Sequence, residues 1–199
     1  MIRRLPISTR VPDTSLFRAT HLAIAMTLLA VLSIAVLRAG GWGFGRAGVA
    51  SARSYRGARA GVVLVFIILI FGALTANVAG ANVSCQGFPW CRSVLVTGTP
   101  LYIQVTHRVL AFLLLFHMIG LPLGIRRRRE SPLVQKAAWF ALGAIILQII
   151  VAAGMVGLQL PPAWRSLHQA VGTLVWLSVF TFAALARYSQ ATHARMLDA

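Results

Sequence analysis

Five long apolar stretches set the strongest limit on what this chain can fold into. A helix needs about 20 mainly apolar residues to cross the hydrocarbon core of a bilayer, and each stretch is of that order. A soluble domain cannot bury this much apolar surface, because 58% of the 199 residues are hydrophobic and only 11% are charged. We therefore predict an all-α integral membrane protein with five transmembrane helices. The expected spans are residues 20–37, 60–78, 102–125, 136–157 and 167–186.

The basic residues gather between these stretches. A net charge of +16 would suggest a nucleic-acid partner in a soluble protein. Here the charges fill the first and third connections, and excess Arg and Lys in alternate short loops is typical of the cytoplasmic side of a membrane protein. We therefore expect a multi-pass plasma-membrane protein, with no nucleic-acid partner and with the second and fourth connections outside. The basic residues are Arg46, Arg53, Arg56 and Arg59 in the first connection, and residues 126–129 with Lys136 in the third.

The N-terminal segment conflicts with this topology. Five spans and a cytoplasmic C-terminus place the N-terminus outside, yet it carries Arg3, Arg4, Arg10 and Arg18. This is the reverse of the positive-inside pattern.

The second connection contains both cysteines of the chain, in the segment GANVSCQGFPWCRS. Disulfides persist on the outer side of the plasma membrane. The intervening residues include Gly87 and Pro89, which allow the turn that brings Cys85 and Cys91 to bonding distance. We predict a Cys85–Cys91 disulfide that acts as a structural staple. A redox-active pair and free or metal-bound thiols are the alternatives.

Two segments of the chain repeat one pattern. Both LFRATHLAIAMTLLAVLSIAVLRAG, from Leu16, and AWRSLHQAVGTLVWLSVFTFAALAR, from Ala163, place a His three residues after an aromatic-Arg pair. His21 and His168 therefore occupy equivalent positions in two copies of one helix. We expect one complete four-helix bundle, preceded by the last helix of another. The expected domains are 1–59 (a lone helix with a basic loop), 60–187 (the transmembrane bundle) and 188–199 (a cytoplasmic tail).

Two histidines lie near the outer ends of spans that run in the same direction. An ionisable residue inside a span is costly unless it is paired or ligated. His107 and His168 lie at similar depth, and two facing imidazoles are what a six-coordinate heme iron requires. A hydrogen-bonded structural pair and another metal are the alternatives. Zinc is less suitable, because no thiolate or carboxylate lies at that depth.

Polar residues beside these histidines are candidates for contacts with heme carboxylates. Gln104 precedes His107 by about one turn, Arg108 follows it, and Arg165 precedes His168 by three residues. Gln104 is also a candidate to hydrogen-bond a group that supports the ligand, and the arginines are equally suited to anchoring helices at the membrane surface.

The other polar residues suggest structural roles. His117 lies about 15 Å from His107 along the same helix, so we expect it to hydrogen-bond a neighbouring helix. His193 is expected to be solvated. Only Asp13, Glu130 and Asp198 are acidic and none lies in a span, so any chemistry must come mainly from a cofactor. The small residues in GALTANVAGAN and AAGMVG allow close helix packing, with or without a flat ligand between the helices.

Together, GALTANVAGANVSCQGFPWC, QVTHR and LQLPPAWRSLHQAVG resemble segments of the heme A synthases. The resemblance implies a fold of two similar four-helix bundles in tandem. It also implies an activity, the oxidation of the C8 methyl of heme O to the formyl of heme A, which supplies cytochrome oxidase biogenesis. The resemblance implies that His107 and His168 are axial ligands of heme b and that Cys85–Cys91 is the outer-loop disulfide. The substrate-side bundle of the family has Glu three residues before its first ligand; Gln104 resembles the cofactor-side bundle instead.

The resemblance covers helices four to eight of the eight that the family has. His21 resembles the last ligand of the first bundle, without its mate. We therefore expect a truncated or mis-started product, or a half-length form that works as a homo-oligomer or with a separate chain. Heme O, membrane lipid and an unidentified electron donor are the expected partners. The alternatives are a non-enzymatic b-type heme protein for electron transfer or heme handling, and an inactive fragment.

Overall fold

The computed structural model describes residues 13–40 and 48–197, with side chains described for residues 14–40 and 48–189. Several residues considered above therefore lie outside this description: Arg3, Arg4, Arg10, Arg46, Asp198 and the side chains of Asp13 and His193.

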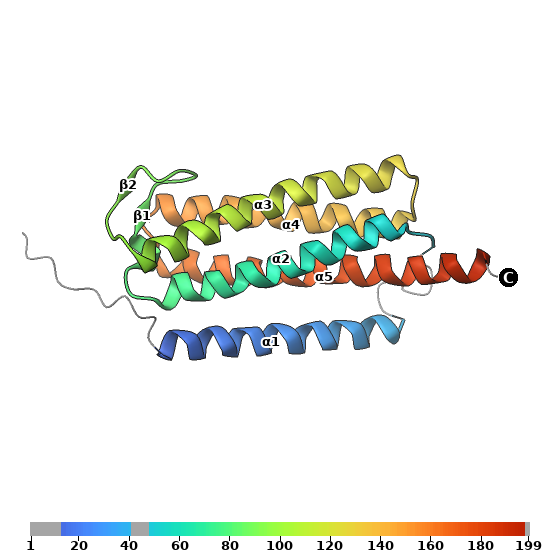
Figure 1. Ribbon diagram of the computed structural model, residues 1–199, viewed down its shortest axis with the longest axis horizontal. Coiled ribbons are helices and arrows are strands. Elements are labelled where there is room, and N and C mark those ends of the chain that lie inside the picture. Colours follow the sequence, from blue (N-terminus) through green and yellow to red (C-terminus); the bar gives the residue numbers. More distant parts are fainter. Residues whose placement is uncertain (1–12, 41–47, 198–199) are drawn as a thin grey trace, which may run out of the picture.

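Within the described residues, five long helices make up almost the whole fold (Figure 1). Each helix is long and apolar enough to cross a membrane, which confirms the predicted all-α multi-pass membrane protein. Their bounds are α1 Asp13–Arg38, α2 Ala52–Asn77, α3 Thr99–Arg127, α4 Pro132–Gly157 and α5 Pro162–Leu197.

Helices α2 to α5 form a four-helix bundle, and α1 lies outside it. In the bundle, α2 packs against α3 and α5, while α4 packs against the same two helices. Helix α1 packs against α2 and α5 (Figure 1). The Trp176 indole of α5 donates a hydrogen bond to the Met26 carbonyl of α1 (2.9 Å). The predicted architecture of one complete bundle plus an extra N-terminal helix is confirmed.

The helix ends follow local signals. Pro100, Pro132 and Pro162 lie in the first turns of α3, α4 and α5, where a missing N–H costs no helical hydrogen bond. Ser51 caps α2 by accepting the Ser54 N–H at 3.2 Å. Helix α3 ends just before Arg129, whose φ of 53° breaks the helical path.

The helices extend beyond the apolar spans predicted from the sequence. Helix α2 begins at Ala52 and not near residue 60, and α5 continues to Leu197, across the boundary expected at residue 187. Arginine, glutamine and alanine are good helix formers, and no Pro interrupts these extensions, although Gly57 lies within the first of them. Hydropathy marks the part of a helix that lies in lipid, whereas helix propensity decides where it ends.

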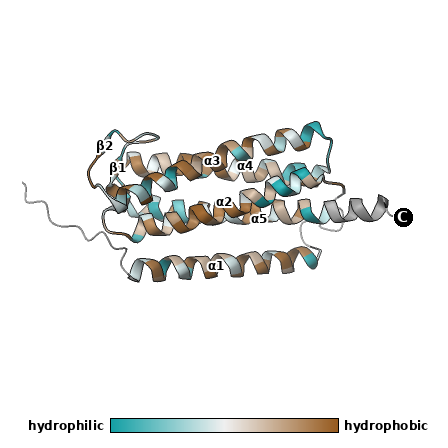
Figure 2. Cartoon of the chain, viewed as in Figure 1, coloured by the Kyte–Doolittle hydropathy of each residue, from teal (hydrophilic) through white to brown (hydrophobic). Residues whose placement is uncertain are grey.

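The two ends of the bundle differ in character. One end, here called the cysteine-loop end, carries the short helix η2 (Ala81–Val83) and the strands β1 (Cys85–Gln86) and β2 (Ser93–Val94). The strands pair antiparallel, with Cys85 opposite Val94. The opposite end, here called the arginine end, is where α3 ends and α4 begins, and α2 starts there too (Figure 1). Hydrophilic residues concentrate towards both ends, and apolar ones lie between them (Figure 2).

Large buried side chains pack closely against the helix backbones in the bundle core. Phe182, Val179 and Met118 are fully buried, and Gly61 of α2 allows Met118 to approach, since a Cβ there would lie 3.3 Å from its sulfur. Large apolar side chains also point outward; Phe116 is 67% exposed. Because a large apolar surface is costly in water and favourable in lipid, the outer surface suits a bilayer.

Candidate functional site

His107 of α3 is held in one orientation by the backbone of α2. Its Nδ1 lies 3.1 Å from the Ile68 carbonyl oxygen. A carbonyl only accepts, so Nδ1 carries the proton, and Nε2 of the neutral ring keeps its lone pair. This arrangement, in which one ring nitrogen donates to a carbonyl while the other stays free, is typical of histidines that bind metals.

Gly72 makes this contact geometrically feasible. A Cβ at this position of α2 would lie 3.1 Å from Cε1 and 3.6 Å from Nδ1 of His107. Gly72 lies one helical turn after Ile68, so its missing side chain leaves the space in which the imidazole reaches the Ile68 carbonyl. The stretch GALTANVAGAN, which suggested close packing, therefore includes a residue that packs against a candidate ligand.

His168 lies in the second turn of α5 and contacts Gln148 of α4. The Gln148 Nε2 donates to the His168 carbonyl oxygen at 3.0 Å, and it lies 3.1 Å and 3.3 Å from the two ring nitrogens. The Gln148 Oε1 is buried and has no hydrogen-bond partner among the described residues. Sequence reasoning missed Gln148. The signal was available, because an amide inside an otherwise apolar span is itself unusual.

The two histidines come from diagonally opposite helices, since α3 and α5 each pack against both α2 and α4. His107 lies in the third turn of α3 and His168 in the second turn of α5, and both helices begin at the cysteine-loop end (Figure 1). Among the described side chains, no group of three or more His, Cys, Asp or Glu residues gathers to hold a metal ion. Two imidazoles are too few for a metal site built from four protein ligands. They suit a metal ion that is held in a macrocycle and needs only two ligands from the protein.

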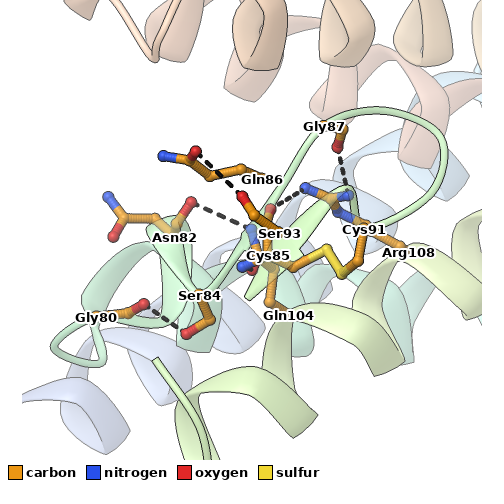
Figure 3. The surroundings of a disulfide bond; sticks show 10 residues. All are labelled: Gly80, Asn82, Ser84, Cys85, Gln86, Gly87, Cys91, Ser93, Gln104 and Arg108. Atoms are coloured by element: carbon orange, nitrogen blue, oxygen red, sulfur yellow. Dashed lines mark hydrogen bonds between the residues drawn. A yellow bond between two sulfur atoms is a disulfide. The ribbon is translucent and has the colours of Figure 1, made fainter. Parts of the chain in front are cut away.

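The predicted Cys85–Cys91 disulfide is present at the adjacent end of the bundle (Figure 3). The two Cα atoms are 5.2 Å apart, and Cys85 is buried. The Arg92 N–H donates to the Gln86 carbonyl at 2.8 Å, which closes the turn around the bond. Trp90, between the cysteines, is 81% exposed and is therefore not part of the core.

Gln104 and Arg108 of α3 attach this loop to the helix that carries His107 (Figure 3). The buried Gln104 amide accepts the Cys85 N–H and donates to the Asn82 carbonyl at 3.1 Å. The Arg108 guanidinium donates to the carbonyls of Gly87 (2.7 Å) and Cys85 (2.8 Å). The partners shown for both residues are therefore in the loop. The Gln104 amide is engaged at both its oxygen and its nitrogen, whereas Arg108 has further N–H donors.

For the remaining candidates in the described part of the chain, Arg165, His21 and His117, the structure shows no contact with His107 or with the cysteine loop. Arg165 is exposed in the first turn of α5, and His21 is exposed on α1, outside the bundle. His117 lies nearer the arginine end, where its Nε2 is 2.8 Å from the Gly57 carbonyl oxygen of α2. The expectation that His117 hydrogen-bonds a neighbouring helix is confirmed.

Fold and site together define a polytopic helical membrane protein, whose four-helix bundle holds a histidine pair beneath a disulfide-bonded loop. A model of the COX15-CtaA family, described as cytochrome oxidase assembly protein, matches residues 7–180. The chain belongs to this family, and its role is in cytochrome oxidase assembly. This confirms, at the level of the family, the resemblance to heme A synthases. A search of curated proteins finds no match.

Proposed function

We propose that this protein is a heme A synthase-type oxidoreductase, which takes part in oxidising the C8 methyl of heme O to the formyl of heme A. In this proposal His107 and His168 are the axial ligands of a resident heme b. The observation that carries it is the orientation of His107, whose Nδ1 donates to Ile68 and whose Nε2 is left free. Membership of the COX15-CtaA family supports the same function.

The donor set fits heme b. The two imidazoles come from diagonally opposite helices of one bundle, so both would be available to hold a heme iron. When bound, heme b would supply one-electron redox chemistry that side chains cannot. The protein would set the ligand orientation through Ile68 and Gln148. Arg108, next to His107 on α3, would have further N–H donors to offer a heme propionate.

The cysteine loop is proposed to lie outside the plasma membrane and the arginine end in the cytoplasm. The support comes from charge. Arg53, Arg56 and residues 126–129 are all at the arginine end, whereas the cysteine loop carries Arg92 alone. This orientation places the histidine pair near the outer surface.

His21 is proposed to serve an adjoining bundle. It occupies the same position on α1 as His168 on α5, yet α1 lies outside the complete bundle and His21 is exposed. Helices beyond the five described would provide its mate and the rest of the heme O site. The electron donor would be a separate protein or molecule.

A second candidate is a non-enzymatic b-type heme protein that transfers electrons or handles heme. It is favoured by the lack of Asp and Glu within the five spans, because methyl oxidation needs proton transfer as well as electron transfer. This candidate predicts reversible heme reduction without conversion of heme O.

The test is a reduced-minus-oxidised optical spectrum of the protein in detergent, recorded also for His107→Ala and His168→Ala. His193→Ala, outside the spans, is the matched control. We expect sharp low-spin b-type bands in the wild type and in the control, and their loss in both ligand variants. A wild-type protein without heme, or ligand variants that keep the bands, would overturn the heme b site. If the heme b site is confirmed, an assay for conversion of added heme O to heme A distinguishes the proposed enzyme from the proposed electron carrier.

A further inference from the structure

A polar pocket of about 400 Å³ lies between α2 and α3 at the arginine end, far along α3 from the histidine pair. It is here called the arginine pocket. Its lining comes from the first turn of α2 and the last three turns of α3. The residues are Arg53, His117, Gly120, Leu121, Gly124, Arg127 and Arg128.

Close packing of the two helices borders the pocket. A Cβ at Gly57 would clash with the Leu121 side chain, and the His117 ring bonds the Gly57 carbonyl. Gly120 differs from Gly57, because a Cβ there would meet no atom within 4 Å. The helices therefore touch at Gly57 and leave open space beside Gly120.

One wall of the pocket is fixed by a buried carboxylate. The Arg128 Nε donates to the Glu130 Oε1 at 2.6 Å, and its Nη2 donates to the Ser54 hydroxyl at 2.7 Å. The guanidinium also lies over Gly124, where a Cβ would be 3.0 Å from Nη1. Arg128 is thus held in place before any ligand arrives, so binding would cost little ordering of this side chain.

The pocket keeps a positive charge after this pairing. Three arginines line it, and the carboxylate of Glu130 offsets only Arg128, so the net charge is +2. Arg53 and Arg127 are exposed, and among the side chains of residues 14–40 and 48–189 neither forms an ion pair with a carboxylate. Two free guanidinium groups beside an open volume are typical of a site for a phosphate.

A lipid-facing stripe of α3 leads to the pocket. Phe116 is 67% exposed, Ile119 39% and Leu123 42%. Leu123 lies one turn before Arg127, and Phe116 one turn before Gly120, so the stripe and the pocket share a helix face. An acyl chain on this stripe would bring its own phosphate to the level of the arginines.

We propose that the arginine pocket binds the phosphate of an anionic phospholipid of the cytoplasmic leaflet. Arg53 and Arg127 donate charge-assisted hydrogen bonds to the phosphate, Arg128 forms the fixed wall, and the space beside Gly120 receives the headgroup. The acyl chains lie along the stripe formed by Phe116, Ile119 and Leu123. This proposal rests on the proposed membrane orientation, and it is independent of the histidine pair and of the proposed enzymatic activity.

The test is native mass spectrometry of the full chain in detergent, titrated with phosphatidylglycerol or phosphatidylcholine. Arg53→Gln/Arg127→Gln removes the two free guanidinium groups. Arg56→Gln/Arg126→Gln removes equal charge from exposed positions of the same two helices that do not line the pocket. Gly120→Leu fills the open space without a change of charge, and Leu is a better helix former than Gly.

We expect one tightly held phosphatidylglycerol per chain, with at least about tenfold weaker binding of phosphatidylcholine. The Arg53/Arg127 variant should lose about tenfold or more in affinity, and Gly120→Leu should show a similar loss, while the Arg56/Arg126 control keeps wild-type binding. Equal losses in both double variants would show a general charge effect and overturn the pocket. Unchanged binding by Gly120→Leu would also overturn it. Displacement of the lipid by excess inorganic phosphate would assign the pocket to free phosphate and overturn the lipid proposal.

Discussion

Arg108 donates a hydrogen bond to the carbonyl of Cys85 at 2.8 Å, across 23 residues of sequence. Because Arg108 directly follows His107 on α3, the disulfide loop is attached to the helix that carries a candidate heme ligand. Gln104, one turn earlier, bonds the backbone N–H of the same cysteine. The loop is thus held at two points of α3, and the disulfide closes it.

The first prediction concerns this attachment. Arg108→Gln removes two charge-assisted hydrogen bonds, to Gly87 and Cys85, and we expect it to destabilise the loop by about 2 kcal/mol. Limited proteolysis in detergent should cut the loop faster, with the disulfide intact. Arg92→Gln, which removes an exposed arginine from the same loop, should be cut at the wild-type rate. Equal cutting of both variants would contradict the role of Arg108.

The second prediction concerns the disulfide. Its short loop, with a sequence separation of 6, implies a stabilisation of about 2 kcal/mol by chain entropy. Cys85→Ser/Cys91→Ser should therefore lower the unfolding temperature in detergent and make it insensitive to reductant. Because Gln104 and Arg108 still hold the loop, we expect the spectrum of the proposed heme b to persist. Complete loss of the spectrum would mean that the disulfide alone positions the site.

The third prediction separates ligand geometry from helix stability. The Cβ of Gly72→Ala would lie 3.1 Å from His107 Cε1, so the ring must move by a few tenths of an ångström, which disturbs its bond to Ile68. Ala also favours the helix by up to about 1 kcal/mol. We expect Gly72→Ala to bind heme more weakly while the unfolding temperature of the apoprotein is unchanged or higher.

The control for Gly72 is Gly143→Ala, at a helical position with open space around the added Cβ. It should bind heme like the wild type. Equal heme affinity in Gly72→Ala and Gly143→Ala would show that Gly72 does not shape the histidine site.

The fourth prediction identifies Gln148 as a positioning residue for His168. Gln148→Leu removes the donor to the His168 carbonyl and the contact with its ring. We expect heme to remain bound, with altered g values in the electron paramagnetic resonance spectrum of the oxidised protein, because the ligand plane is free to rotate. Identical spectra for the variant and the wild type would exclude this role.

The fifth prediction is a pH dependence at the arginine end. Burial by itself raises the pKa of Glu130, but hydrogen bonds from Arg128, Ser51 and Ser54 outweigh it, so the pKa lies below its ordinary value of 4.5. A carboxyl with a lowered pKa stabilises the folded state above that ordinary value and loses this contribution as the pH falls through its folded-state pKa.

Glu130→Gln tests this dependence. The wild type should lose stability in detergent as the pH falls below 4.5, whereas Glu130→Gln should be less stable at neutral pH and show a smaller loss on acidification. We expect a neutral-pH difference of about 1–3 kcal/mol, since the charged partner of Arg128 is removed from a buried position. Parallel pH profiles for the two proteins would contradict the role of Glu130.

Local properties of the sequence determined much of this protein. Apolar stretches predicted five membrane-spanning helices, and the structure contains them. The spacing of Cys85 and Cys91 predicted their disulfide, and the depth of His117 predicted a bond to a neighbouring helix. Each of these features depends on short segments, in which hydropathy, spacing and helical rise are sufficient.

The partners of the functional residues were decided only by the tertiary structure. Gln104 and Arg108 were predicted beside His107, but their bonds to the cysteine loop depend on how that loop folds back. In the sequence, Glu130 is a single acid in a basic loop. Its hydrogen bond from Ser51, 79 residues away, depends on how the helices pack. Contacts such as His107 with Ile68 and Gln148 with His168 depend on the rotation and depth of whole helices. Those are set by packing between helices, and no local stretch of sequence encodes them.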